Sequence, residues 1–206
     1  MGAGTKPLRA DAARNRDKLL AAATQVFGER GLDAPLEEIA RRAGVSIGTL
    51  YNHFPTRDTF FAAIFPDRLA ALDRVIESAL ADADPWHGLE SFLSGLFAVQ
   101  ARDRGLNDAV VREYRLALDA SGVCQNGFEQ AMEIFERAKR AGRLRADFEA
   151  EDLVTLVWAV SQVIRETIDT APDTWRRCLT LFLDGLRARP EPETTPATPH
   201  PGAGPG

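Results

Sequence analysis

Apolar residues recur every three or four positions along almost the whole chain, the spacing that places them on one face of a helix. No stretch shows the period-two alternation of a half-buried strand. The pattern therefore predicts an all-α fold. The expected helical segments are 11–30, 35–43, 46–54, 60–82, 85–97, 106–118, 128–135, 151–167 and 171–187.

Start and stop signals divide the first sixty residues into short helices. Gly31 and Gly44 each follow a helical run and are expected to end it, because glycine adopts the left-handed conformation at low cost. Pro35 suits the first position of a helix, where its missing N–H is not needed. Ser46 and Thr56 are typical N-cap residues, so a third helix is expected after Ser46 and a fourth after Thr56.

The composition excludes several classes of protein. With 45% hydrophobic residues the chain of 206 residues is too apolar to be disordered throughout. It lacks a run of about 18 apolar residues for a membrane span, and its N-terminus does not resemble a signal peptide. Two cysteines make neither a disulfide framework nor a four-cysteine metal site. We therefore expect a cytoplasmic protein with no membrane partner.

Charge and proline content differ along the chain. The whole chain has a formal net charge of −5, yet residues 1–60 carry nine basic and seven acidic side chains. A mildly basic N-terminal end on an acidic protein is weak support for a surface that binds a polyanion. Residues 1–10 are small and polar, and 189–206 are rich in proline, so we expect a flexible arm and a disordered tail.

The segment 36–54, LEEIARRAGVSIGTLYNHF, is the most informative part of the sequence. Two short helices joined by a glycine-containing turn of about four residues form a helix-turn-helix. Val45 and Leu50 would fill the core beneath the turn, and Ala40 is small where the helices cross. From spacing alone, two packed helices with a glycine link and no DNA-binding role remain an alternative.

The exposed side of the second of these helices carries side chains suited to DNA. It would present Ile47, Gly48, Thr49, Asn52 and His53. Thr49 and Asn52 can hydrogen-bond base edges, and Ile47 can contact a thymine methyl group. Tyr51 and His53 have the size to reach the flanking backbone. The free N–H groups that follow Ser46 favour a phosphate.

From Arg16 to about Phe61 the sequence resembles the TetR/AcrR family of transcriptional regulators. The segments that carry the resemblance are LLAAATQVFGERGLD, LEEIARRAGVS and GTLYNHFPTRDTFF. The resemblance implies that Thr49, Tyr51 and His53 touch DNA and that Arg57 contacts a phosphate. Arg42, at the end of the second helix, lies near the turn. The family often has a threonine before the second helix, where this chain has Ala34 and Pro35.

The resemblance also implies an N-terminal three-helix DNA-binding domain followed by a larger helical ligand-binding and dimerisation domain. We expect the domains at 11–56 and 57–188, between the arm and the tail. Dimerisation would use the last two helices, 151–167 and 171–187, which are the most apolar of the chain. The alternative is that these two helices only close the core of the subunit.

Large side chains of the middle helices are candidates to line an effector pocket, although an aromatic stripe at helical spacing is more often ordinary core. The candidates are Trp86, Phe92, Leu96, Phe97, Tyr114, Phe128, Met132, Trp158 and Gln162. Tyr114 and Gln162 are the polar members that could orient a ligand. The sequence does not identify the effector.

Motifs for catalysis and for metal or cofactor binding are missing from the sequence, which predicts a protein that is not an enzyme and needs no cofactor. The leading hypothesis is a homodimeric repressor that binds a palindromic double-stranded DNA operator and is released from it by a small-molecule effector. One alternative is a helical small-molecule-binding or interaction protein without DNA binding. Another is an activator with the same DNA-binding motif.

Overall fold

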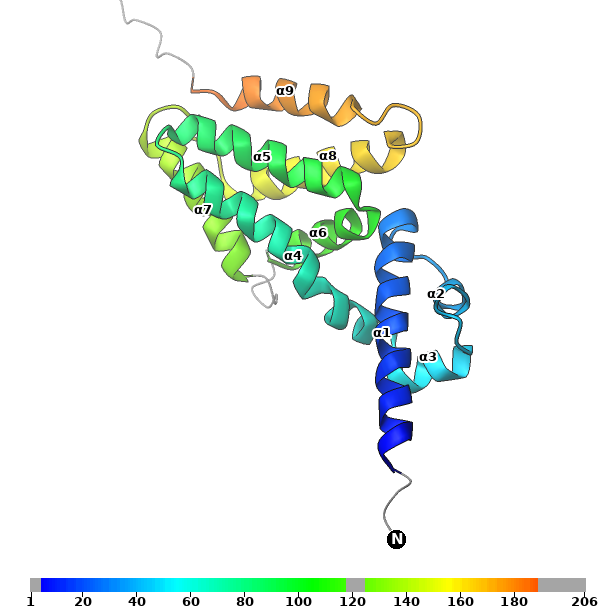
Figure 1. Cartoon of the computed structure of the whole chain (residues 1–206). Helices are drawn as coiled ribbons and strands as arrows, with labels where there is room; N and C mark the ends of the chain where they lie inside the picture. The colour runs from blue at the N-terminus through cyan, green and yellow to red at the C-terminus, as the bar shows by residue number, and fades with distance from the viewer. Residues whose placement is uncertain (1–4, 118–124, 189–206) are drawn as a thin grey trace, which may run out of the picture.

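The computed structural model describes residues 5–117 and 125–188, and this part of the chain consists of helices joined by turns and loops (Figure 1). Its helices are α1 (Thr5–Arg30), α2 (Leu36–Ala43), α3 (Ile47–His53), α4 (Arg57–Ala81), α5 (Pro85–Arg102), α6 (Arg104–Ala117), α7 (Gln125–Arg140), α8 (Ala150–Thr167) and α9 (Thr174–Leu186). The all-α prediction is confirmed. The expected tail, 189–206, lies outside the described residues.

One group of helices, which we call the head, consists of α1, α2, α3 and the start of α4. In Figure 1, α2 and α3 lie on one side of the long helix α1. The core of the head is a separate cluster of buried side chains that includes Phe27 of α1 and Leu50 of α3. Phe60 of α4 stacks on Phe54 with ring centroids 4.0 Å apart, so α4 begins inside this core.

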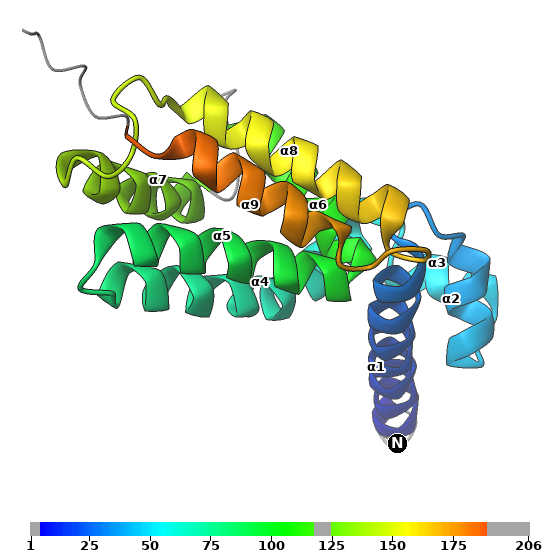
Figure 2. The same ribbon diagram turned by 90° about the horizontal axis from the view of Figure 1, so that it is seen from above.

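The remaining helices, the rest of α4 with α5–α9, form what we call the bundle. In Figure 2, α8 and α9 lie side by side on one face of the bundle, and α4 and α5 lie on another. Helix α5 packs against α4, α6, α7, α8 and α9, so it is the central helix of this core. Phe135 of α7 stacks on Phe148 at 4.7 Å and meets the edge of Phe92 of α5.

Several helix starts differ from the sequence prediction, and three of them have a clear local reason. Helix α1 begins at Thr5 rather than at 11, and Pro7 is compatible with this because it falls in the first turn, where its N–H has no intrahelical partner. Pro35 is the N-cap of α2 rather than its first residue, with an extended ψ of 136°. Helix α9 begins at Thr174, after a turn in which the N–H of Thr174 donates to the carbonyl of Ala171.

The ends of the bundle are fixed by local hydrogen bonds. Asp84 caps α5 by accepting the N–H of Trp86 at 2.9 Å. Glu149 and Asp152 form a capping box at the start of α8.

None of the described helices combines the length and the apolarity that crossing a bilayer requires.

Candidate DNA-binding site

The turn between α2 and α3 has the geometry that the sequence predicts. Gly44 has a φ of +67°, in the left-handed region that favours glycine. Its N–H donates to the carbonyl of Arg41 at 3.2 Å, and the N–H of Val45 donates to that of Ala40 at 3.1 Å. These two bonds form a Schellman motif, which ends α2 and redirects the chain into α3.

Helix α3 has one anchored side and one free side. Leu50 is fully buried in the core of the head, and Val45 packs against the same core. At the start of the helix, the hydroxyl of Ser46 accepts the N–H of Thr49 at 3.1 Å. A helix of seven residues has little stability of its own, so this cap and the buried leucine fix its orientation.

The free side of α3 carries the side chains that the sequence singles out. Ile47 is 38% exposed and Tyr51 is 46% exposed. Asn52 is exposed as well, while Thr49 and His53 are partly exposed. The structure therefore brings a methyl-bearing side chain, two hydrogen-bonding side chains and two larger rings together on one surface. Such a surface matches the donors, acceptors and methyl groups of a DNA major groove.

Arg42 is engaged within the head. Its guanidinium donates to both carboxylate oxygens of Glu29, at 2.8 and 2.9 Å, and lies 3.5 Å from Glu38. Arg41 also binds Glu38, and this hydrogen bond is the main reason that the pKa of Glu38 lies below its usual range. Arg42 thus links α2 to α1, so a phosphate would have to compete with Glu29 for it.

Two further basic residues lie around α3. Arg57 is the first residue of α4, and its side chain is outside the described part of the structure. Thr56 caps α4 in a reciprocal arrangement with Thr59. Arg16 of α1 lies over the ring of Phe54, with its guanidinium carbon 5.6 Å from the centroid. Sequence reasoning missed Arg16, because its position beside the end of α3 depends on how α1 packs.

The head and the bundle meet at α6 as well as along α4. The carboxylate of Asp108 accepts the N–H of Leu32 at 2.9 Å, across 76 residues of sequence. Gly31 has a φ of +80°, and a Cβ there would lie 2.4 Å from the same carboxylate. Ala109, which follows Asp108 in α6, is buried in the core of the head. Burial raises the pKa of Asp108 above its ordinary value.

The candidate effector-binding residues are distributed between the core and the surface of the bundle. Buried in the core are Trp86, Phe92, Leu96 and Phe97. Phe128, Met132 and Gln162 are partly buried. Tyr114 lies in α6, and its side chain is outside the described part.

Trp158 differs from the expectation of an interior pocket, because the residue is 48% exposed. The reason is that α8 is apolar on two sides. The first side packs into the bundle through Val157 and Val160, whereas Trp158 extends from the other. On α9, Leu181 and Phe182 are exposed large apolar residues too.

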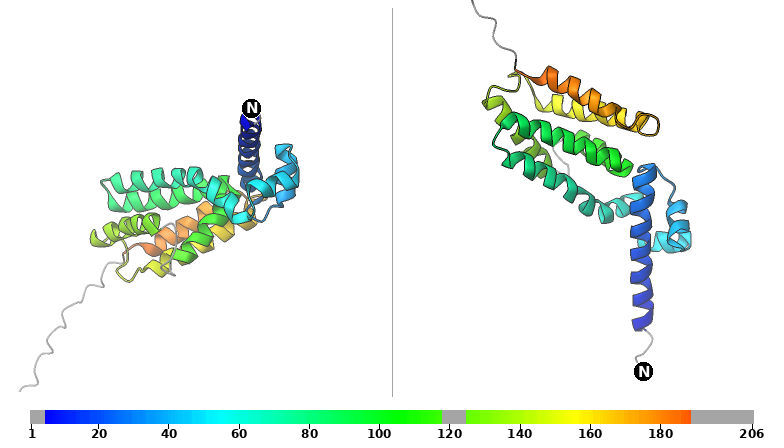
Figure 3. Two further views of the ribbon diagram at one scale, coloured as in Figure 1. Left: turned by 90° about the horizontal axis from the view of Figure 1, so that it is seen from below. Right: turned by 45° about the horizontal axis from the view of Figure 1, so that its top comes forward.

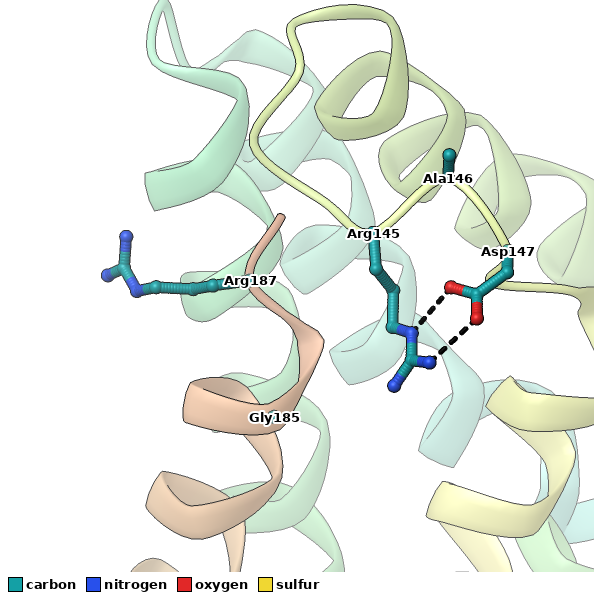
Figure 4. A pocket seen from close by; sticks show the side chains of 5 residues that line it. All are labelled: Arg145, Ala146, Asp147, Gly185 and Arg187. Carbon is teal, nitrogen blue, oxygen red and sulfur yellow. Dashed lines mark hydrogen bonds and ion pairs between the residues drawn. The ribbon is translucent and has the colours of Figure 1, made fainter. Parts of the chain in front are cut away.

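Two surface hollows of about 310 and 400 Å³ lie where the loop after α7 meets the end of α9. Figure 4 shows the smaller one, in which Arg145 forms a double hydrogen bond to Asp147, at 2.6 and 2.7 Å. The side chain of Arg187 points away from this pair and lies over the ring of Trp86 instead. None of the residues named above as effector-pocket candidates lines either hollow.

Taken together, a short helix held by a glycine turn, with its polar face outward, and a larger helical domain define a helix-turn-helix transcriptional regulator. Residues 19–64 match the family model described as "Bacterial regulatory proteins, tetR family". Residues 84–188 match "Transcriptional regulator SbtR-like, C-terminal domain". The chain belongs to the TetR family of transcriptional regulators, which are not enzymes.

Individual relatives agree with this assignment. The chain is 28% identical to the transcriptional repressor BepR of Brucella suis over 165 residues, which is 74% of this chain and 79% of BepR. It is 32% identical to the regulator YvdT of Bacillus subtilis over 108 residues, about half of either protein. The regulatory protein TetR from Rhodobacter sphaeroides has the same fold, with a TM-score of 0.59, 19% identity and coverage of 84% of this chain and 98% of that one.

Proposed function

We propose that this protein is a dimeric repressor that binds a palindromic operator through α3 and leaves it when a small molecule binds the bundle. The observation that carries the proposal is the outward face of α3, which is fixed by the buried Leu50 and by the Ser46 cap. The relative BepR, named as a repressor, supports repression. The proposal includes a cytoplasmic location, where the operator DNA is found.

The side chains of α3 divide into two roles. Thr49 and Asn52 read base edges and Ile47 contacts a thymine methyl group, so these residues set the sequence preference. Tyr51 and His53 contact the flanking backbone and set the position of the helix. We propose that the free N–H groups at the N-terminus of α3, after Ser46 and around Gly48, contact DNA phosphates. Arg57 and Arg42 are proposed as further phosphate contacts, Arg42 in competition with Glu29.

Dimerisation through α8 and α9 is supported by their exposed apolar side chains. Trp158, Leu181 and Phe182 lie on two helices that run side by side on one face of the bundle (Figure 2). In a two-fold dimer each of these residues is buried twice, once in each subunit. The same symmetry gives two α3 helices, which matches a palindromic operator with half-sites about one turn of DNA apart or a multiple of it.

Release by an effector needs a connection between the bundle and the head. Among the described residues, helix α4 runs from the bundle to the head (Figure 3, right), and Asp108 of α6 holds the N–H of Leu32 in the turn after α1. An effector that prefers one arrangement of these helices shifts the population of head positions. The two α3 helices then no longer match the spacing of the half-sites.

The direct test is a fluorescence-anisotropy titration of the purified chain with DNA from its own upstream region and from the promoters of neighbouring genes. We expect sequence-specific binding that weakens steeply with salt, because phosphate contacts release counterions. Scrambled DNA of the same length is the control. Equal affinity for scrambled and genomic DNA would contradict the proposal, and tighter promoter binding with activated transcription would assign an activator.

A further inference from the structure

Three buried polar side chains, here called the amide cluster, meet where α5, α6 and α8 pack. They are Gln100, Asn107 and Ser161, the buried polar residues of the part of the chain that the structure describes. The hydroxyl of Ser161 donates to Oε1 of Gln100 at 2.7 Å. Nδ2 of Asn107 donates to the backbone carbonyl of Ser161 at 3.3 Å. The cluster therefore connects three helices of the bundle.

Two atoms of the amide cluster have no hydrogen-bond partner among the described residues. They are Nε2 of Gln100, a donor, and Oδ1 of Asn107, an acceptor. Buried polar atoms in folded proteins are nearly always paired, because an unpaired one loses its hydration without compensation. Two such atoms in one cluster indicate a place where another molecule supplies the missing donor and acceptor.

The orientation of Asn107 specifies what that molecule must offer. Since Nδ2 bonds to a carbonyl, which can only accept, the Asn107 amide cannot be reversed. Its Oδ1 therefore needs a donor. Gln100 bonds to a hydroxyl, which both donates and accepts, so either of its amide atoms can be the one that faces a ligand. A hydroxyl group can both donate to Asn107 and accept from Gln100, whereas a carboxylate or a ketone offers no donor to Asn107.

Asn107 also lines a cavity of about 120 Å³ between the head and the bundle. Gly31 and Asp33 of the head, and Ile164 and Ile168 at the end of α8 and beyond it, contribute to its wall. The charged groups around this cavity are Arg30, Arg104 and Arg165 against Asp33 and Asp108, and Arg104 also forms an ion pair with Asp169, so the two signs balance. The mixed charge and the amide chemistry together favour an uncharged ligand over an anion.

We propose that the amide cluster binds the hydroxyl group of a small uncharged alcohol and passes this binding to the head through α6. The proposal rests on the proposed function, because it gives the effector a chemical class and a site. Asn107 and Asp108 are consecutive residues of α6. The first belongs to the cluster, and the second holds the N–H of Leu32 in the head. A ligand that draws Asn107 toward itself therefore displaces the residue that positions the head.

The test uses three probes, namely the ring compounds cyclohexanol and cyclohexanone and the salt potassium acetate. Cyclohexanol offers a donor and an acceptor, cyclohexanone offers only an acceptor, and acetate is a charged acceptor. The readouts are the ¹⁵N side-chain amide signals of Gln100 and Asn107, and the melting temperature of the full chain. The variants Gln100→Met and Asn107→Leu assign the two signals by their loss.

We expect cyclohexanol to shift both amide signals and to raise the melting temperature by about 3–6 °C at ten times its dissociation constant. Cyclohexanone and acetate should do neither. Gln100→Met and Asn107→Leu should remove the response to cyclohexanol. The control variant Gln130→Leu changes an amide of α7 outside the cluster, and it should respond to cyclohexanol like the native chain.

Four results would overturn the proposal. The first is an equal response to cyclohexanol and cyclohexanone, and the second is a shift caused by acetate. The third is a response that survives Asn107→Leu or that disappears in Gln130→Leu. An absence of any response assigns the two amides to bound water and also rejects the proposal. None of these readouts involves DNA, so operator binding measured separately shows whether the proposed function fails or only this site.

Discussion

The outward face of α3 and the outward face of α8 and α9 both expose large apolar side chains, yet they differ in what accompanies them. On α3, Ile47 and Tyr51 alternate with hydrogen-bonding residues such as Thr49 and Asn52. On the bundle, Trp158 is exposed on a helix whose opposite side is already buried, and it has further apolar side chains beside it on α9.

This difference indicates two different partners. A mixed face on a short, capped helix suits the polar and patterned surface of a DNA groove. A second apolar side on a long helix suits an equally apolar surface, which a second copy of the chain provides. The comparison predicts that a substitution in one face can weaken DNA binding or dimerisation directly and leave the other face intact. The four predictions below test that separation.

The largest effect is expected from Trp158→Glu. If the indole is buried in a two-fold interface, its loss counts twice, at about 1.5–3 kcal/mol for each copy. Dimerisation then weakens by about 3–6 kcal/mol, or roughly 100-fold or more in the dimer dissociation constant. Sedimentation velocity should show a monomer, and operator affinity should fall because the two heads no longer bind together.

The control for this prediction is Ser78→Glu, which adds the same charge to an exposed position of α4, away from α8 and α9. It should remain dimeric. If Trp158→Glu also remains dimeric at low concentration, the interface lies elsewhere and the contrast between the two faces disappears.

The next effect is that of Leu50→Ala. This substitution leaves a cavity beneath α3 and should destabilise the head by about 2–5 kcal/mol. Hydrogen exchange should become faster in α2 and α3 while the bundle stays protected, and operator binding should be lost. The chain should remain a dimer. Leu93→Ala makes the same change in the core of the bundle, so it should destabilise α5 and its neighbours instead.

The head could be predicted from the sequence because its determinants are local. Gly44, Ser46 and Leu50 lie within seven positions, and each has a conformational preference or an apolar character that identifies its role without knowledge of the rest of the fold. The all-α class followed from periodicity for the same reason. The contacts of these residues with DNA remain a prediction.

The contacts that connect distant segments could not be predicted in this way. The bond of Asp108 to the N–H of Leu32 spans 76 residues, and nothing in the local sequence of either residue indicates it. Arg42 was assigned to DNA from its place near the turn, while its pairing with Glu29 depends on how α1 packs on α2. Trp158 was assigned to a pocket because an apolar residue gives no sign of which side of a two-sided helix it occupies.

A smaller effect is expected from Tyr51→Phe, which removes one hydroxyl from the exposed face of α3. If that hydroxyl contacts a phosphate, affinity should fall by about 1–2 kcal/mol, and by the same amount on every DNA sequence. Anisotropy titrations with an operator and with single-base variants of it measure this directly. Asn52→Ala is the counterpart, because it should change the relative affinities of the variants. A base-specific loss in Tyr51→Phe would overturn the role of Tyr51.

The smallest effect concerns a pair that lies on neither face. His87 bonds to Asp82 in the turn between α4 and α5, at the end of the bundle away from the head (Figure 1). The hydrogen bond from His87 keeps the pKa of Asp82 below its usual range, and the same bond raises the pKa of His87. Arg137 also contacts this turn, by donating to the carbonyl of Asp82 at 2.7 Å.

The sign of the pH dependence follows from these two directions. The stabilisation from His87 is complete below its unfolded pKa of about 6.5 and is lost as the pH rises through its raised folded value. The stabilisation from Asp82 is present above its unfolded pKa of about 3.8 and is lost as the pH falls through its lowered folded pKa. Thermal unfolding between pH 6 and 9 should show a decline that is absent in His87→Gln. Because the pair lies on neither face, the affinity for operator should be the same in His87→Gln as in the native chain at every pH, and a difference would mean that this end of the bundle is coupled to the head.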